Sequence, residues 1–352
     1  STTTLPSVTV DGAPPELAEL IAGLYRTPFG APPPPMPDGL AADLAAALPQ
    51  QPPASATAAV GSFGPDVTLA VVEAADDVTL AVADPEWRVV GGWWPSLGVG
   101  AHLGEYPKTV AVVGSDARPH ERRDETRTDS IHFVVIAEDG PAGIVSVPRD
   151  SWVEIPAHGK SRINAALVYG GTKLMMETFE SVSGLDFDGY LLTGFKGFEG
   201  LIDVLGGLRI DVPRDLVDPS AKANLKKGLQ TLGPKDALAL ARVRKSLPRG
   251  DFDRAFHGGL MLRAAQAQLR AEGPLRLPGL LSAARPHFST SFAPDELLVL
   301  AASVLRVDPA LVSNVVAPGR AGMAGKASVV FLDDSAAELF SDLSDGHLES
   351  VD

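Results

Sequence analysis

The sequence predicts a layered α/β fold preceded by a smaller α+β region. Beyond residue 107, apolar β-rich runs alternate with amphipathic helical runs, which is typical of a layered α/β domain. Before that point, a polyproline-type spacer at 31–37 separates short helical and β-rich runs. Charge divides the chain in the same way. Residues 1–106 hold 12 acidic residues and two arginines, so they carry −10 of the total net charge of −14. We expect an acidic accessory region over 1–106 and the main domain over 107–345.

The accessory region begins with two predicted helices. Pro14-Pro15 precede leucine and isoleucine residues at helical spacing between Leu17 and Leu24, which predicts a helix. A second short helix is predicted over 40–48, followed by a Pro/Ala/Gln-rich loop at 49–58.

Three short β-rich runs then predict a small meander, at Val67–Val72, Val78–Val82 and Trp87–Val90. Trp87, Trp93 and Trp94 fall at its end. Such tryptophans most often cap a small core, and the alternative is a glycan-stacking surface.

The main domain takes its predicted order from changes in hydrophobic period. The predicted strands are 108–113, 131–136, 143–147, 190–193, 208–212, 312–316 and 328–332. The predicted helices are 164–169, 172–183, 195–205, 235–242, 251–270, 294–305 and 334–343, with Gly170-Gly171 separating the first two.

Composition excludes several classes of protein. An acidic lobe joined to a near-neutral one argues against nucleic-acid binding as the main function. The chain has no cysteine, which rules out a disulfide framework and thiol catalysis. It has no apolar run of eighteen residues, the length expected of a transmembrane helix. No Gly-x-Ser-x-Gly, Walker, Rossmann or zinc pattern is present.

Five charged residues cluster at the ends of predicted strands. They are Asp116, Arg118, Arg127, Asp129 and Arg149. Side chains at strand ends of an open α/β sheet gather where ligands bind. Carboxylates suit Mg²⁺ and arginine forks suit phosphate, so the pattern indicates a site for a metal ion and a phosphate. The alternative is a set of surface salt bridges.

A second charged set lies between two predicted helices. It comprises Arg242, Arg244, Lys245, Arg249 and Arg254, with Asp251 and Asp253. A charge run is usually a solvated helix face, but this one surrounds a Pro-Arg-Gly turn and can hold a diphosphate. A Pro-Arg-Asp at 213–215 lacks acidic partners, and we interpret it as a loop.

Several motifs in order resemble the LytR-CpsA-Psr family of cell-wall glycopolymer transferases, in its actinobacterial type. They are GSDAR (114–118), RTDS (127–130), VPRDSWVEIP (147–156), INAALVYGG (163–171), LIDVLGGLRIDVP (201–213), ALARVRKSLPRGDFDR (239–254) and SNVVAPGRAGMAGKASVVFL (313–332). The resemblance covers roughly residues 107–345. It implies a catalytic domain that is a three-layer α/β/α sandwich with a central mixed sheet and an apolar tunnel for a polyprenyl chain.

The resemblance also implies a reaction. A glycopolymer phosphate passes from a polyprenyl-diphosphate carrier to peptidoglycan and forms a phosphodiester, with Mg²⁺ or Mn²⁺ as cofactor. Asp116 and Asp129 would bind the metal, and Arg127, Asp129 and Arg149 would be catalytic, with Asp129 a candidate base. The diphosphate would be held by Arg118, Arg149, Arg242, Arg244 and Arg254. The implied location is extracytoplasmic, at the membrane, anchored by a segment outside this chain.

One part of the pattern departs from the family. Where many members have an arginine and one or two glutamines, this chain has His257, Gly258 and Gly259. Protonated His257 can replace one lost donor. The departure keeps two alternatives open: a hydrolase of polyprenyl diphosphates, and a non-catalytic envelope protein that binds lipid or glycan.

Overall fold

The computed structural model describes residues 8–48, 53–118 and 120–348. The chain divides into two compact units. The N-terminal unit comprises Ser1–Glu105, Leu269–Arg285 and Phe292–Arg306, and the sandwich unit comprises Tyr106–Gln268, Pro286–Ser291 and Val307–Asp352. Two later segments thus group with the N-terminal residues, and the single domain boundary expected between 106 and 107 remains a prediction.

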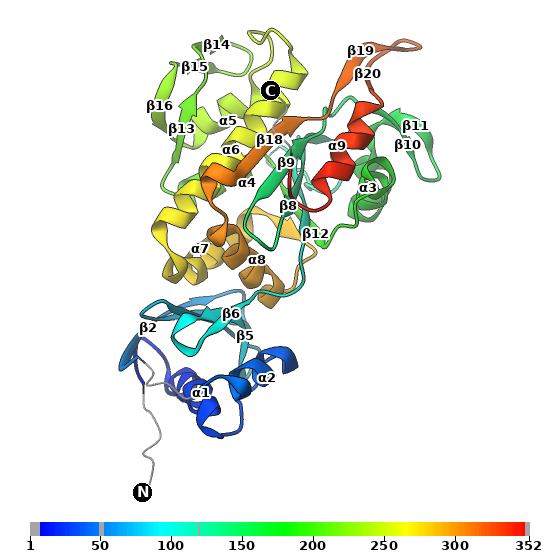
Figure 1. Ribbon diagram of the computed structural model, residues 1–352. Coiled ribbons are helices and arrows are strands. Elements are labelled where there is room, and N and C mark those ends of the chain that lie inside the picture. Colours follow the sequence, from blue (N-terminus) through cyan, green and yellow to red (C-terminus); the bar gives the residue numbers. More distant parts are fainter. Residues whose placement is uncertain (1–7, 49–52, 119, 349–352) are drawn as a thin grey trace, which may run out of the picture. The chain divides into compact units, whose positions relative to one another are not determined.

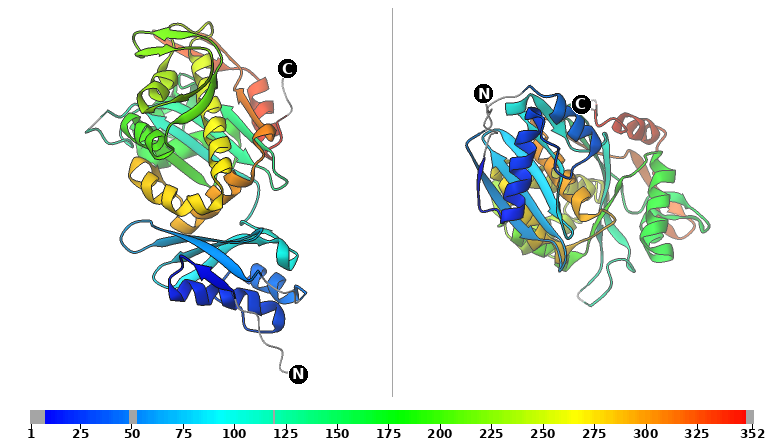
Figure 2. Two further views of the ribbon diagram at one scale, coloured as in Figure 1. Left: turned by 90° about the vertical axis from the view of Figure 1, so that its left-hand side faces the viewer. Right: turned by 90° about the horizontal axis from the view of Figure 1, so that it is seen from below.

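The N-terminal unit contains a six-stranded sheet in the order β1-β2-β3-β4-β5-β6. Its strands are β1 (Thr9–Asp11), β2 (Ser55–Ser62), β3 (Thr68–Ala74), β4 (Asp77–Ala83), β5 (Trp87–Trp94) and β6 (Val99–His102). The unit's helices are α1 (Pro15–Arg26), α2 (Asp38–Ala46), α7 (Leu277–Ala284) and α8 (Pro294–Arg306). Figure 2 shows α1 and α2 together on one face of this sheet.

The predicted helices and meander of this unit are confirmed, and the loop predicted at 49–58 is wrong where it overlaps β2. Residues 49–52 lie outside the described residues. β2 consists mainly of small residues with little β-propensity, so its sequence carries a weak strand signal. Trp94 is fully buried in the core, and Trp93 is covered by the Arg306 guanidinium at 4.9 Å. The core interpretation therefore holds for Trp94.

The sandwich unit is built on a mixed six-stranded sheet in the order β17-β12-β7-β8-β9-β18. Its strands are β7 (Lys108–Ser115), β8 (Thr128–Ile136), β9 (Ala142–Ser146), β12 (Gly189–Thr193), β17 (Ser289–Thr290) and β18 (Val312–Val316). β7, β8 and β9 are antiparallel neighbours, whereas β12 runs parallel to β7 and β18 runs parallel to β9.

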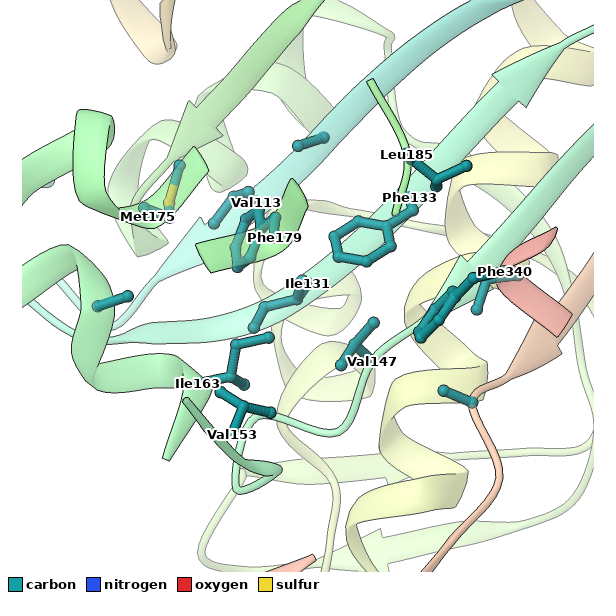
Figure 3. Packing of buried hydrophobic residues seen from close by; sticks show 14 of the residues in the cluster. Val113, Ile131, Phe133, Val147, Val153, Ile163, Met175, Phe179, Leu185 and Phe340 are labelled. Carbon is teal, nitrogen blue, oxygen red and sulfur yellow. The ribbon is translucent and has the colours of Figure 1, made fainter. Parts of the chain in front are cut away.

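One face of this sheet packs under α3 (Ala166–Ser183) and α9 (Ser335–Leu343), where Phe133 contacts Phe179 and Phe340. Figure 3 shows these rings beside Ile131 and Val147. The opposite face lies against α6 (Asp251–Glu272), and Figure 1 shows α6 and α3 on opposite sides of β8. The three-layer α/β/α sandwich with a central mixed sheet, and the additional N-terminal α+β region, are therefore confirmed.

The helix labelled α3 is broken at the predicted glycine pair. Gly170 and Gly171 have non-helical backbone angles, and Gly171 has φ +66° and ψ −162°, a conformation almost restricted to glycine. The two predicted helical segments are thus separated where the sequence indicates, at the entry to the core helix.

The remaining elements of the unit are a helix pair and four two-stranded ribbons. The helices are α4 (Phe195–Val204) and α5 (Pro234–Arg242). The ribbons pair β10 (Trp152–Ile155) with β11 (Gly159–Arg162), β13 (Leu208–Val212) with β16 (Gly228–Leu232), β14 (Leu216–Asp218) with β15 (Ala223–Leu225), and β19 (Gly319–Ala324) with β20 (Ala327–Leu332). Across the described ranges, no helix has both the length and the apolarity needed to cross a membrane.

Candidate active site

A β-bulge positions the central carboxylate, Asp129. The β7–β8 register pairs Gly114 with Ser130 and then Ser115 with Thr128. Asp129 is therefore an extra residue of β8 with no paired residue on β7. Regular alternation would place Asp129 on the face of Ile131 and Phe133, inside the apolar core. The bulge releases it from that face, as bulges beside active sites commonly do.

Asp116 follows β7 and lies at the same end of the sheet. Its main-chain N–H donates to the Arg127 carbonyl at 2.9 Å, and the Arg127 N–H donates to Asp116 Oδ1 at 3.0 Å. The first bond extends the β7–β8 ladder by one step and the second fixes the Asp116 carboxylate, so Asp116 and Asp129 lie at adjacent strand ends.

Arg149 follows β9 and joins three carboxylates. Its Nη1 donates to Asp129, and its Nε lies 4.0 Å from Asp150 and 3.9 Å from Asp251. The nearby charges, led by Asp129, raise the pKa of Arg149 in spite of the opposing effect of burial. Arg149 is thus a permanent cation held at the edge of the sheet.

The predicted basic loop meets Arg149 at Asp251. Arg244 Nε lies 3.9 Å from Asp251 Oδ1, and Arg254 Nη2 lies 2.7 Å from the same oxygen. Arg244 also lies 3.9 Å from Asp150. Separations near 3.9 Å are too long for direct hydrogen bonds, so guanidinium N–H groups of Arg149 and Arg244 remain available to a ligand.

Asp218, at the end of β14, fixes the backbone of this loop. Its Oδ2 accepts hydrogen bonds from the N–H groups of Arg244 at 3.1 Å and Lys245 at 3.0 Å, and Oδ1 accepts from Ser220. These bonds, led by that from the Ser220 hydroxyl, hold the pKa of Asp218 well below its usual range. The anionic carboxylate therefore keeps Arg244 facing Asp251.

The structure brings four of the predicted site residues into one cluster: Asp129, Arg149, Arg244 and Arg254. Arg118 and Arg127 have exposed side chains, outside the ion pairs that join this cluster in the described chain. Arg242 is exposed too, with its guanidinium 5.0 Å from the centre of the Phe195 ring.

No role was predicted for Arg162 and Asp218. Asp150 was expected only as a charge at a strand end, and Asp251 only as one of the charges in the basic run. Asp251 and Arg254 are three residues apart on one helix, a spacing that brings side chains together and could have identified Asp251. Arg162 lies 3.6 Å from Asp150 and also donates to the Ser328 carbonyl. No local signal points to Asp218, which reaches the loop only through the tertiary fold.

Several buried polar atoms of this region lack hydrogen bonds within the described part of the chain. They are Ser115 Oγ, Thr128 Oγ1, Arg149 Nε and both carboxylate oxygens of Asp251, whose 2.7 Å contact with Arg254 Nη2 is an ion pair without hydrogen-bond geometry. Arg149 also lines a narrow cavity, together with Asp129, Ser130 and Arg254. Because buried polar groups are normally satisfied, such a concentration indicates a place prepared for a polar ligand.

His257 does not supply the expected extra cation. It is 3% exposed, and burial lowers its pKa below the ordinary value, so the imidazole is neutral at neutral pH. The two glycines that follow lie directly against the sheet. A Cβ added to Gly258 would lie 2.5 Å from the His132 ring, and one added to Gly259 would lie 1.9 Å from Asn314 Oδ1.

The carboxylates of the site bear on whether it can hold a metal ion. The described residues contain no group of three or more His, Cys, Asp or Glu side chains placed to hold one. Asp116 and Asp129 are two carboxylates at one sheet edge, which suits Mg²⁺ because this ion is commonly bound by one or two carboxylates together with substrate phosphates.

Two named cell-wall proteins are similar to this chain in sequence. The chain is 29% identical over 194 residues to "Polyisoprenyl-teichoic acid--peptidoglycan teichoic acid transferase TagU" of Bacillus mycoides, covering 54% of this chain and 62% of the relative. It is 31% identical over 152 residues to "Probable cell wall biosynthesis protein LcpB" of Corynebacterium glutamicum, covering 43% and 36%. The matched region thus spans less than two thirds of either relative.

Solved structures share the fold. TagT bound to LIIa-WTA superposes with a TM-score of 0.60 at 23% identity, covering 69% of this chain and 91% of TagT. TagT with bound octaprenyl pyrophosphate lipid superposes with a TM-score of 0.54 at 20% identity, covering 69% and 90%. The sequence model of the LytR_cpsA_psr family matches residues 99–344, well over half of the chain. This chain therefore belongs to the LytR_cpsA_psr family.

Proposed function

We propose that this protein transfers a glycopolymer phosphate from a polyprenyl-diphosphate carrier to a hydroxyl of peptidoglycan, forming a phosphodiester. The observation that carries the proposal is the convergence of Arg149, Arg244 and Arg254 on one buried carboxylate, Asp251. The names of TagU and of the liganded TagT structures agree with this substrate class.

The arginine cluster would act on the charge of the reacting phosphoryl group. Phosphoryl transfer depends mainly on positioning and on stabilising the charge that develops on the phosphoryl oxygens. Arg149 and Arg244 approach from different segments of the chain, the β9 end and the 242–250 loop, so together they can hold a diphosphate from two sides. Arginine is suited to this task because its planar fork binds phosphate oxygens in pairs.

Asp129 has three roles in this proposal, as the partner of Arg149, as the general base and as a metal ligand. Its ion pair orients Arg149, and its position on the bulge lets it accept the proton of an incoming hydroxyl, as a general base must. Asp116 and Asp129 would hold Mg²⁺, which when bound neutralises charge on the phosphate oxygens. We assign Arg118, Arg127 and Arg242 to the rim, where exposed side chains can reach the carrier or its polymer.

The carrier's apolar chain requires a surface of its own. Val112, Val134 and Leu191 lie on interior strands, on the sheet face opposite the Phe133 core, yet remain only partly buried. α4, which packs beside β7, adds Phe195, Phe198 and Leu201, also partly buried. We infer that the polyprenyl chain covers these residues, because burying apolar area contributes roughly 25 cal/mol per Å².

Two finer assignments belong to the same proposal. The acceptor, peptidoglycan, implies action outside the cytoplasmic membrane. The match to a Corynebacterium glutamicum protein supports an actinobacterial-type protein, although the Bacillus relative is matched with similar identity.

The experiment is a transfer assay with a polyprenyl-diphosphate-linked glycopolymer and peptidoglycan, comparing wild type with Arg149→Ala. Loss of one preorganised charge-stabilising group typically costs about 100- to 1,000-fold in rate. Arg320→Ala is the matched control, because Arg320 is exposed and pairs only with Asp333 in the described chain. Full activity of Arg149→Ala would contradict the proposal.

The same assay separates the two alternatives. Release of phosphate or lipid monophosphate without acceptor would indicate a hydrolase. Binding of lipid without turnover, with Mg²⁺ or Mn²⁺ supplied, would indicate a non-catalytic envelope protein.

A further inference from the structure

Three hydrogen-bonded side chains lie next to the arginine cluster on the α6 side of the sheet. Ser130 Oγ lies 2.6 Å from His132 Nε2, and His132 Nδ1 lies 2.7 Å from Ser146 Oγ. His132 and Ser146 are 4% and 0% exposed. Ser130 lines the same narrow cavity as Asp129, Arg149 and Arg254. Ser146, His132 and Ser130 thus form a row of hydrogen-bonded side chains that runs from the interior of the unit to the site.

Both strands and the helix above fix the His132 ring. His132 on β8 pairs directly with Ser146 on β9. From α6, Gly258 approaches so closely that a Cβ there would lie 2.5 Å from both Cε1 and Nε2 of the ring. The glycine therefore lets the helix backbone rest on the imidazole, and the ring has no room to turn away from Ser130.

The His132 imidazole is neutral, so the hydrogen bonds of the row can be donated in either of two directions. Burial, assisted by the charge of Arg254, lowers the pKa of His132 to about 4. A neutral ring has one donor and one acceptor nitrogen. In one direction Ser146 donates to Nδ1, Nε2–H donates to Ser130, and the Ser130 proton is free for the cavity. In the other, Ser130 donates to Nε2, and only its lone pairs face the cavity.

We propose that Ser130 is a further diphosphate-binding residue whose hydroxyl donates to a phosphate oxygen, and that His132 and Ser146 are positioning residues that hold this hydroxyl as a donor. The inference rests on the proposed function, which places a diphosphate between Arg149 and Arg244, where a phosphate oxygen can approach this cavity beside Arg149. An anion there selects the direction in which all three donors point toward it, and aligned hydrogen bonds strengthen one another.

The row also accounts for the departure at 257–259. Gly258 and Gly259 bring no side chain to the site, and His257 is a buried neutral ring. The sheet provides polar groups in the space that those positions leave, His132 facing Gly258 and Asn314 facing Gly259. A donor from β8 therefore replaces a donor from α6, without a second buried charge and its desolvation cost.

The test is calorimetric titration of the full chain with farnesyl diphosphate. A hydrogen bond to a charged group is worth enough that Ser130→Ala should raise Kd about 10-fold or more. Ser130→Thr, which keeps the hydroxyl, should restore Kd to within about threefold of wild type. Ser341→Ala, an exposed position on α9, is the matched control.

A second readout reports the positioning role. In ¹⁵N NMR of the complex, His132 should carry its proton on Nε2, and Ser146→Ala should weaken that preference while raising Kd less than Ser130→Ala does. Unchanged Kd in Ser130→Ala, or an Nδ1–H tautomer in the complex, would overturn this inference alone. Failure of the wild type to bind the probe would overturn the proposed function as well.

Discussion

Two buried aspartates, one in each unit, have opposite surroundings. Asp77 of the N-terminal unit is 1% exposed and accepts hydrogen bonds from the Tyr25 hydroxyl at 2.7 Å and the Ser96 N–H at 2.9 Å. Asp251 of the sandwich unit is 8% exposed, is approached by three arginines, and receives no well-directed hydrogen bond within the described residues. The hydrogen bonds around Asp77 are complete and stabilise the N-terminal unit. Those around Asp251 are incomplete, which leaves its arginines able to bind a ligand.

The largest effect on the free energy of unfolding should come from replacing Asp251, whose hydrogen bonds are incomplete. Asp251→Asn leaves buried Arg254 and its neighbours without their shared counter-charge, and breaking a buried pair in this way typically costs about 3–5 kcal/mol. Farnesyl diphosphate should recover much of this loss, because its phosphates take the place of the carboxylate. Urea unfolding with and without the ligand measures both effects. A loss that the ligand leaves unchanged would make Asp251 a purely structural residue.

A smaller effect should appear on acidification. His132 has an ordinary pKa of 6.5 when unfolded and about 4 when folded. Between these values the unfolded chain binds a proton that the folded chain does not, so stability is lost as pH falls from 6.5 to 4. The loss is at most about 3 kcal/mol. Unfolding of wild type and His132→Met across this range should show the steeper slope in the wild type, and equal slopes would contradict the assignment.

Changing the complete network around Asp77 should alter stability without altering the response to the ligand. Asp77→Ala leaves the Tyr25 hydroxyl and the Ser96 N–H unpaired inside the N-terminal unit, at a cost of about 2 kcal/mol. Farnesyl diphosphate should stabilise this variant as much as it stabilises the wild type. Selective rescue of Asp77→Ala by the ligand would remove the contrast between the two aspartates.

The smallest expected effect tests how closely α6 rests on the site. Gly258→Ala places a methyl group against the His132 ring and should cost about 1 kcal/mol or more, as overpacking does. Gly279→Ala is the matched control, because this glycine lies in α7 and a Cβ added to it would meet no atom within 4 Å. Alanine there should stabilise by up to about 1 kcal/mol. Thermal unfolding of both variants gives the difference.

The regular elements of the sandwich unit could be predicted from sequence because their apolar residues follow a period of two or of 3.6. β13, in which buried and exposed residues alternate, and the amphipathic α4 are examples. β2 and most ribbon strands could not, because short strands of small or polar residues lack that period. Two ribbon strands, β13 and β20, were predicted at 208–212 and 328–332. The ribbon that ends in Asp218 is such a case, although its carboxylate fixes the basic loop.

The site was predicted in part, for a related reason. Residue type and position at strand ends indicated Asp129 and Arg149, and the basic run indicated Arg244 and Arg254. Pairing between distant segments decided the rest: Arg118 and Arg127 stay exposed, Asp251 joins the arginines, and His132 meets Ser130 beneath Gly258. Contacts of this kind depend on strand register and helix approach, which local patterns do not specify.

The bulge at Asp129 makes β8 sensitive to chain length as well as to residue type. Because alternate residues of a strand face opposite sides, a one-residue change moves every later side chain to the other face. Deleting one residue between Arg127 and Ser130 would either pair Asp129 regularly, toward the core of Phe133, or shift the strand and expose that core. Insertions and deletions here should therefore be far less tolerated than substitutions, so the spacing between the Asp129 carboxylate and the buried rings is itself part of the site.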